Sequence, residues 1–467
     1  MLPLPFTGVL TILGRFRAMS KTDNYQFLTT GSVGKVILTM AVPTIISMMV
    51  SSIYNLVDSY YVGMLNTQAT AAVGLVFPVM SLIQAVGFFF GQGSGTYISR
   101  ELGAKHQENA EVMASTSFFS SILFSCLIGA VGLIFLDPIS RLIGSTPTIL
   151  PYTKTFLLVM LIATPLYAGA FVLNNQMRFQ GNASRAMRGL LVGAVVNVVL
   201  VPVLMFVLGM GFLGMAIGTA LSEVVAFVAL LRMSSRAGNI RIDIRKFRPS
   251  KELFANIVGG GTPSLVRQGF ASVAVVLLNV VTRGYGDAAI AGLSLVGRIS
   301  FMLFAVMLGI GQGYQPFCGF NYGARLYGRI RKGFAFAMKV SLLLLVIAGT
   351  LCFIFAPQIL WFMRPDPDVV KIGTLSFRCN IVALPFVAFV TMSNMTLQTC
   401  GKTIPANIVA SCRSGIVFIP AIFTLEPLLG LFGLQICQGV TDFVSFLVAL
   451  PLITRFFRSL KQSDSPS

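Results

Sequence analysis

The sequence predicts an all-α membrane protein of twelve transmembrane helices, arranged as two six-helix lobes related by a pseudo-twofold axis along the membrane normal. Three observations lead to this fold class. The 467-residue chain is 55% hydrophobic and only 10% charged, with a mean hydropathy of +0.84. It contains twelve apolar segments, and its motifs recur about 220 residues apart. A soluble protein could not cover this much apolar surface with so few charges.

The predicted helices are each long enough to cross a hydrocarbon core, which needs about 20 residues. Six lie in each half of the chain. In order, they cover residues 36–62, 71–97, 112–136, 152–177, 187–208, 212–232, 253–282, 288–317, 333–356, 372–398, 404–424 and 430–454.

Basic residues separate these helices in an alternating pattern. Of the 34 Lys and Arg residues, 24 lie in the terminal segments and in the loops that follow even-numbered helices, 5 lie in the opposite loops, and 5 lie within helices. This asymmetry places both termini on the cytoplasmic side. The net charge of +19 is therefore explained by topology, and we expect no nucleic-acid partner.

The longest basic loop, residues 234–251, divides the chain between the sixth and seventh helices. An even number of crossings gives both lobes the same orientation. The predicted parts are a cytoplasmic N-terminal segment (1–35), an N-lobe (36–233), a basic linker (234–252), a C-lobe (253–455) and a cytoplasmic tail (456–467). Because the run Met19-Ser20-Lys21 is typical of a translation start, we also expect residues 1–18 to be an extension without function.

The internal repeat is visible in short motifs. The motif Gly-Gln-Gly at 91–93 returns at 311–313, and Gly-Ala followed by a basic residue at 103–105 returns at 323–325. A duplication of this size in an apolar chain is typical of a transporter built from two related halves. The chain contains no nucleotide-binding loop, and its seven cysteines form no CxxC pair. We therefore expect no bound cofactor and no metal framework, with an ion gradient as the energy source.

Only three acidic residues lie well within apolar stretches, namely Asp58, Glu223 and Asp442. An ionisable group inside the membrane is expensive and is usually functional. Asp58 follows Tyr54 by one helical turn, so both lie on one helix face. A desolvated carboxylate favours its protonated form, and with neighbouring oxygens it can instead hold Na⁺. Alternatively, Asp58 caps the outer end of its helix.

Five further motifs occur in order along the chain. They are Tyr-Asn-Leu-Val-Asp at 54–58, Ala-Ala-Val-Gly-Leu at 71–75, Arg-Phe-Gln-Gly-Asn at 178–182, Gly-Phe-Leu-Gly-Met-Ala at 211–216, and Gly-Phe-Asn-Tyr-Gly-Ala at 319–324. With these motifs the chain resembles the multidrug and toxic compound extrusion (MATE) family, and most closely the bacterial branch of DinF-like and MepA-like exporters. The similarity covers about residues 31–455.

The resemblance implies export of lipophilic, cationic drugs or toxic metabolites across the bacterial inner membrane, in exchange for H⁺ or Na⁺, by a monomeric multi-pass antiporter. It also implies an ion-coupling cluster of Asp58, Tyr54, Asn174, Asn197 and Thr219. We expect ion binding at Asp58 to change the packing around a hinge at Pro43 on the same helix.

One position departs from the family pattern. Many relatives carry a second aspartate just before the proline that corresponds to Pro202, where this chain has Val201. Glu223 lies one turn after Thr219 and is a candidate replacement. Alternatively, Glu223 and its repeat partner Asp442 pair with basic residues such as Arg185 or Arg232 at the cytoplasmic mouth.

Flexible and aromatic side chains on the inner helices are candidates for lining a substrate cleft. These candidates are Met205, Arg267, Arg298, Phe301, Met302, Phe304 and Met307. The helices of the C-lobe also contain several arginines, which are salt-bridged or, if they line the cleft, favour anionic cargo. The alternative function is therefore a flippase or exporter of lipid-linked or anionic substrates. An intramembrane enzyme lacks support, because the chain has one histidine and no catalytic constellation.

Overall fold

The structure, a computed structural model, describes residues 21–236 and 238–463. These residues form helices and no strand, and 12 of the helices are long and apolar enough to cross a membrane. The predicted fold class is confirmed. The proposed extension at residues 1–18 lies outside the described residues.

The first half of the chain forms the N-lobe, together with a short helix that precedes it. Its α-helices are α2 (Lys21–Thr30), α3 (Val33–Gly63), α4 (Thr67–Gly103), α5 (Gln107–Ile134), α6 (Leu136–Leu142), α7 (Leu150–Phe179), α8 (Ala183–Pro202) and α9 (Gly211–Ser234). A π-helical turn, η1 (Val203–Val207), continues α8.

The second half forms the C-lobe, which is reached through the 3-10 turn η2 (Ile244–Lys246) in the linker. Its helices are α10 (Lys251–Thr282), α11 (Asp287–Gly323), α12 (Tyr327–Ile354), α13 (Ala356–Met363), α14 (Pro367–Thr399), α15 (Thr403–Ser411), α16 (Phe418–Leu429) and α17 (Leu431–Ser463). The 3-10 turn η3 (Arg283–Tyr285) follows α10, and the π-helical segment η4 (Cys412–Ile416) separates α15 from α16.

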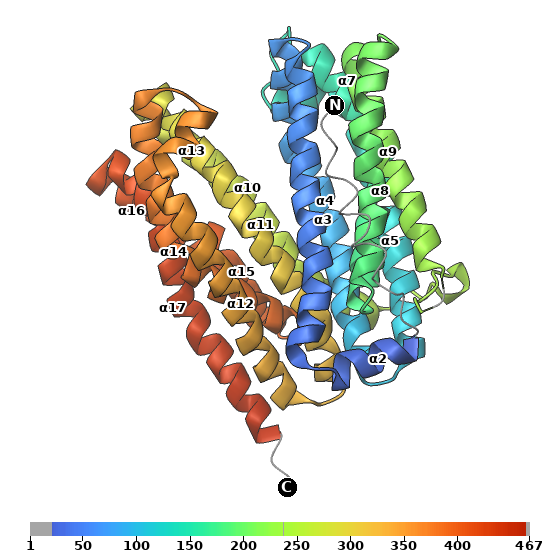
Figure 1. The fold of residues 1–467 in the computed structure, drawn as a ribbon. Coiled ribbons are helices and arrows are strands. Elements are labelled where there is room, and N and C mark those ends of the chain that lie inside the picture. The colour runs from blue at the N-terminus through green and yellow to red at the C-terminus, as the bar shows by residue number, and fades with distance from the viewer. Residues whose placement is uncertain (1–20, 237, 464–467) are drawn as a thin grey trace, which may run out of the picture.

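The two lobes approach each other at one end of the molecule, where α2 lies, and diverge toward the other end (Figure 1). We call the first of these the closed end. Here α3 packs on α11 and α4 packs on α10, with glycines at the contacts. A Cβ atom added to Gly93 would lie 2.3 Å from the Ile257 carbonyl oxygen, and one added to Gly313 would lie 2.4 Å from Ala41 Cα. Small residues therefore allow the helices of opposite lobes to touch along their backbones.

The internal repeat extends to the backbone conformation. Lys105 and Arg325, which are 220 residues apart, are the two non-glycine residues with positive φ among the described residues, at 65° and 57°. Each follows a long helix whose last carbonyls accept hydrogen bonds from the turn, such as His106 N–H to Glu101 O at 2.8 Å and Leu326 N–H to Asn321 O at 2.8 Å. This geometry closes a helix C-terminus with a left-handed residue.

The helix α2 was not predicted, because its sequence is too polar for a membrane span. It lies across the closed end and contacts both lobes (Figure 1). Asn24 Nδ2 donates to the Gln180 carbonyl of the N-lobe at 3.2 Å, and Asn321 Nδ2 of the C-lobe donates to the Leu28 carbonyl at 3.0 Å. The helix therefore ties the lobes together.

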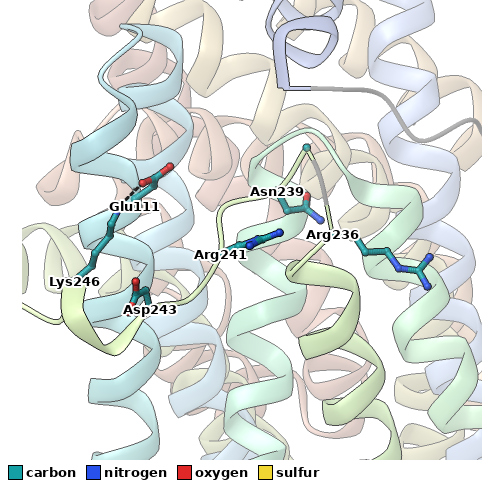
Figure 2. A pocket seen from close by; sticks show the side chains of 7 residues that line it. Glu111, Arg236, Asn239, Arg241, Asp243 and Lys246 are labelled. Atoms are coloured by element: carbon teal, nitrogen blue, oxygen red, sulfur yellow. Dashed lines mark hydrogen bonds and ion pairs between the residues drawn. The ribbon is translucent and has the colours of Figure 1, made fainter.

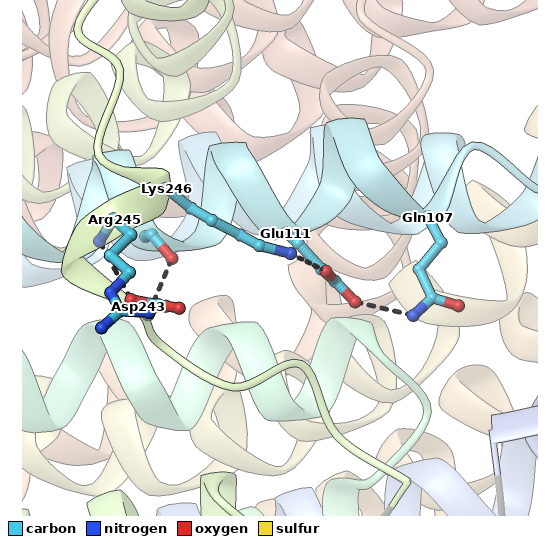
Figure 3. Close-up of polar contacts among 6 residues, drawn as sticks. Gln107, Glu111, Asp243, Arg245 and Lys246 are labelled. Carbon is cyan, nitrogen blue, oxygen red and sulfur yellow. Dashed lines mark hydrogen bonds and ion pairs between the residues drawn. The ribbon is translucent and has the colours of Figure 1, made fainter.

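The linker is fixed to α5 of the N-lobe, as Figure 3 shows. Lys246 forms an ion pair with Glu111, which also accepts a hydrogen bond from Gln107 Nε2 at 2.6 Å. The backbone N–H of Asp243 donates to Ser115 Oγ at 3.1 Å. The hydrogen bond to Glu111 raises the pKa of Lys246 and so favours its charged form.

Candidate functional site

The first candidate site is a carboxylate inside the N-lobe. Asp58 lies in the last two turns of α3 and is 6% exposed. Asn197 of α8 donates its Nδ2 to Asp58 Oδ2 at 3.3 Å. Two elements that are 139 residues apart in the sequence therefore meet at this carboxylate.

Oxygen atoms without hydrogen-bond partners surround it. Asp58 Oδ1, Asn197 Oδ1 and Thr219 Oγ1 are buried, and none has a hydrogen-bond partner among the described residues. Thr219, on α9, is close enough to interact with the carboxylate. Buried acceptors of this kind normally have partners. A group of unsatisfied oxygens that includes a carboxylate suits a proton or a hard cation such as Na⁺.

Glu223 lies within electrostatic reach of Asp58 and of the Tyr167 hydroxyl. It forms no ion pair in the part of the chain that the structure describes. Val201, which occupies the place of the second family aspartate, is fully buried and packs against Gly218. A second acid is therefore near Asp58, but it comes from α9 and not from α8.

The other two members of the expected cluster, Tyr54 and Asn174, are less directly connected to the Asp58 carboxylate. Tyr54 is partly buried one turn before Asp58 on α3. Asn174 Nδ2 donates to the Ala186 carbonyl at 3.2 Å, which ties the end of α7 to the start of α8. Its repeat partner Asn394 makes the same contact in the C-lobe. This symmetry gives Asn174 and Asn394 the same structural role, each in its own lobe.

The helix α3 runs without interruption past Pro43, which is buried. The side chains of Thr44 and Ser47 donate to backbone carbonyls one turn earlier, at 2.8 and 2.9 Å. The segment faces α11 of the other lobe, because Gly309 lies against Ile45. The proposed hinge therefore lies at the contact between the lobes.

Asp442, the repeat partner of Glu223, has a different environment. It is 2% exposed and accepts hydrogen bonds from Arg413 Nε at 2.9 Å and from Gln438 Nε2 at 3.2 Å. The guanidinium of Arg413 also lies 4.4 Å from the centre of the Phe304 ring. The C-lobe acid is neutralised by a salt bridge, whereas the N-lobe acid is not.

Two further arginines lie near the contact between the lobes. Arg178, 3% exposed, donates to Gln312 of the other lobe and, at 2.6 Å, to Asn175 Oδ1. Arg267 donates to Asn394 Oδ1 at 3.1 Å. The helix expected at 152–177 ends before Arg178 and so places this arginine among the loop charges. That placement is wrong, because α7 continues to Phe179 and carries Arg178 into the interior.

The expected cleft residues do not form one surface. Met205 and Met307 are buried within apolar clusters of their own lobes, while Arg298, Phe301 and Met302 are exposed on α11. Exposed apolar residues of a membrane helix can face lipid. Of the seven candidates, Arg267 and Phe304 lie close to polar groups of the interior.

A cavity of about 340 Å³ lies beside the linker, next to the first turns of α5. Arg236, Asn239 and Arg241 line one part of it, and Asp243, Lys246 and Glu111 line the other (Figure 2). The charges are of both signs, and Lys246 is already paired with Glu111. The cavity is consistent with a solvated linker.

The comparison with known families decides the identity. The model of the MatE family matches residues 43–203 and 263–424, one segment in each lobe. This chain belongs to the MatE family. MATE proteins are transporters, so the twelve helices form a multi-pass membrane transporter. The two matched segments start 220 residues apart, which is the offset of the repeat.

Curated relatives of this MATE transporter include the multidrug export protein MepA of Staphylococcus haemolyticus, 26% identical over 93% of this chain and 97% of the relative. MepA of Staphylococcus aureus strain MSSA476 is also 26% identical, over 93% of this chain and 96% of the relative.

Solved structures give the same assignment. An outward-facing conformation of a multidrug resistance MATE transporter matches with a TM-score of 0.88 and 26% identity, over 94% of this chain and 99% of that one. A MOP superfamily transporter from Pyrococcus furiosus matches with a TM-score of 0.88 and 27% identity, over 94% of this chain and 98% of that one. The binding pocket of that protein has reverse polarity, which suggests a different function for it.

Proposed function

We propose that this transporter is a secondary active antiporter that exports lipophilic, cationic drugs or toxic metabolites in exchange for H⁺ or Na⁺. The observation that carries the proposal is the buried Asp58 carboxylate with its unsatisfied oxygen neighbours. Glu223 supplies a second negative group within electrostatic reach. Asp58 is buried and Glu223 is partly buried, and neither forms an ion pair among the described residues. The two neighbouring acids therefore attract a proton or a metal cation, and so provide the coupling site.

The relatives support the cargo class. Two MepA proteins that cover nearly the whole chain are multidrug exporters, and a similar solved structure is a multidrug resistance transporter in an outward-facing conformation. The divergence of the two lobes away from the closed end fits an arrangement that is open on one side (Figure 1). With the basic loops on the cytoplasmic side, this side is the outer one.

In the proposed cycle, the coupling ion binds at Asp58 from outside and removes the charge from the N-lobe interior. The change alters the packing of α3, whose Pro43 segment lies against α11, and favours the inward-facing state. Cargo then enters from the cytoplasm, and release of the ion inside returns the protein to the outward-facing state.

The test is efflux of rhodamine 6G, a fluorescent lipophilic cation, from proteoliposomes under an imposed pH gradient and, separately, a Na⁺ gradient. We expect wild-type protein to respond to one gradient. Asp58→Asn should still bind rhodamine 6G but lose at least about 90% of the gradient-driven rate, because the amide cannot exchange the ion. Gradient-driven efflux of unchanged rate in Asp58→Asn would refute the proposal.

Glu426→Gln is the matched control, since Glu426 lies on α16 of the other lobe and accepts a hydrogen bond from the Tyr285 hydroxyl at 2.7 Å. This variant loses one carboxylate but keeps the N-lobe site. It should keep its coupling. A loss of coupling in both variants would show that any missing acid impairs transport, and would count against a special role of Asp58.

The second candidate function is export of anionic or lipid-linked substrates. The arginines at the lobe contact favour it, as does the similarity to the Pyrococcus furiosus transporter with the reverse-polarity pocket. Absence of rhodamine 6G efflux under either gradient, together with gradient-dependent movement of a fluorescent anionic lipid, would establish this alternative.

A further inference from the structure

The interior near the lobe contact carries more positive charge than its acids can neutralise. Arg178 lies within electrostatic reach of Arg267, and Arg267 lies within reach of Arg413. One carboxylate, that of Asp442, pairs with this group, and it is bound to Arg413. In the described residues, Arg178 and Arg267 have no acidic partner.

These two arginines are held by neutral amides. Arg178 donates to Gln312 and Asn175, and its Nε is buried with no acceptor among the described residues. Within the described part of the chain, Arg267 makes one side-chain hydrogen bond, to Asn394, and it remains partly exposed. Amide oxygens fix the guanidinium groups in position but do not neutralise them. A buried charge without a counter-charge is unfavourable, and it favours binding of an anion.

The architecture does not require either charge. At the 220-residue offset, the partner of Arg178 is Gln398, which donates to Ser264 Oγ at 2.9 Å and to the Gly260 carbonyl. The partner of Arg267 is Ser47, which donates to the Pro43 carbonyl. At each of the two positions, the other lobe therefore has a neutral side chain that is hydrogen-bonded within that lobe. The two arginines therefore break the symmetry of the repeat. They come from opposite lobes, and they lie within electrostatic reach of each other at the lobe contact.

We propose that Arg267, with Arg178 behind it, forms an anion-binding subsite at the lobe contact that receives a carboxylate group of the cargo. This inference deepens the proposed function, because it assumes that cargo enters between the lobes. The subsite lies in a different part of the molecule from the Asp58 and Glu223 pair. A cargo molecule that carries both a lipophilic cation and a carboxylate would then meet complementary charges on both lobes.

Guanidinium geometry supports this ligand class. The planar group presents its N–H donors in a fork that matches a carboxylate with two hydrogen bonds. The one bond to Asn394 leaves the other donors of Arg267 available to a ligand. A free inorganic anion such as chloride shares the charge but not the planar shape, and the experiment separates the two.

The test uses a matched pair of dyes. Rhodamine 110 has a free carboxylate, and rhodamine 123 is its methyl ester with the same cationic ring system. Binding of each dye to the purified full-length protein in detergent is measured by fluorescence polarisation in a buffer of low ionic strength that contains no carboxylate, without any ion gradient. We expect wild-type protein to bind rhodamine 110 about tenfold more tightly than rhodamine 123, the scale of one charge-assisted hydrogen bond.

Arg267→Gln should abolish this preference and leave the affinity for rhodamine 123 within about twofold. Arg267→Lys, which keeps the charge, should retain part of it. Arg378→Gln is the control, because it removes an arginine of the same lobe whose Nε donates to the Phe353 carbonyl at 3.2 Å. That variant should keep the full preference. Size-exclusion chromatography of each variant confirms that it is folded.

Equal affinity of wild-type protein for the two dyes would overturn the proposal, as would an unchanged preference in Arg267→Gln. Adding chloride to this buffer should weaken rhodamine 110 binding if both anions use the subsite. Chloride-dependent stabilisation of wild-type protein without a preference for rhodamine 110 would mean an inorganic anion site, and would refute the role in cargo binding. Because these measurements need no gradient, they are independent of the coupling experiment at Asp58.

Discussion

Individual residues show where sequence reasoning succeeds and where it ends. Asp58, Glu223 and Asp442 were recognisable because acids are rare in apolar helices. Their different environments were not predictable, because the partner of Asp442 is Arg413, a residue from another helix. No local pattern distinguishes a paired acid from an unpaired one. The structure assigns the salt bridge to one lobe and leaves Glu223 beside Asp58 in the other.

A prediction at this scale concerns Arg325, an exposed residue whose φ of 57° is unfavourable for any side chain with a Cβ atom. Glycine adopts this conformation freely and is the usual residue after a helix end. Arg325→Gly should therefore increase the free energy of unfolding by about 1 kcal/mol, measured by denaturant titration in detergent. Arg325→Ala, which keeps the Cβ atom, should leave the free energy of unfolding unchanged. An equal increase of this free energy in both variants would rule out the conformational explanation.

Helices were predictable in number and order, but their ends were not. The helix expected at 333–356 starts at Tyr327, and the one expected at 430–454 continues to Ser463. Hydropathy detects only the part of a helix that lies in hydrocarbon. The basic ends, with residues such as Arg329 and Arg458, extend beyond it and continue the helical hydrogen bonds. The expected helix 404–424 is interrupted by η4, a π-helical segment that hydropathy also cannot detect.

The contact between η4 and α17 leads to a prediction about stability. Arg413→Met leaves the Asp442 carboxylate buried without a charged partner, and such a loss costs about 3–5 kcal/mol. The double variant Arg413→Met/Asp442→Leu removes both charges and should recover most of this loss. Denaturant unfolding of the purified variants measures both values. If the double variant were as unstable as the single one, packing of Arg413 on Phe304 would explain the effect in place of the salt bridge.

At the scale of the whole molecule, the repeat in the sequence predicted two lobes with the same fold, and the paired turns at Lys105 and Arg325 follow it closely. It did not predict the differences between the lobes. Arg178 and Arg267 occupy positions where the repeat partners are Gln398 and Ser47. Only the arrangement of the lobes shows that these two charges approach each other, since they come from helices that are distant in sequence.

The closed end is held by backbone contacts that a single methyl group should disrupt. A Cβ atom on Gly313 would lie 2.4 and 2.5 Å from backbone atoms of Ala41, whereas one on Gly297 of the same helix would meet nothing within 4 Å. Gly313→Ala should therefore separate the lobes at the closed end and increase the population of the inward-facing state, while Gly297→Ala should not.

Spin labels at Glu108→Cys and Gln462→Cys, two exposed positions on opposite lobes, report the separation in a background without the native cysteines. A longer or broader distance distribution is expected in Gly313→Ala alone. An unchanged distribution would mean that α2 and the Arg178 to Gln312 bond keep the lobes together without the glycine contact.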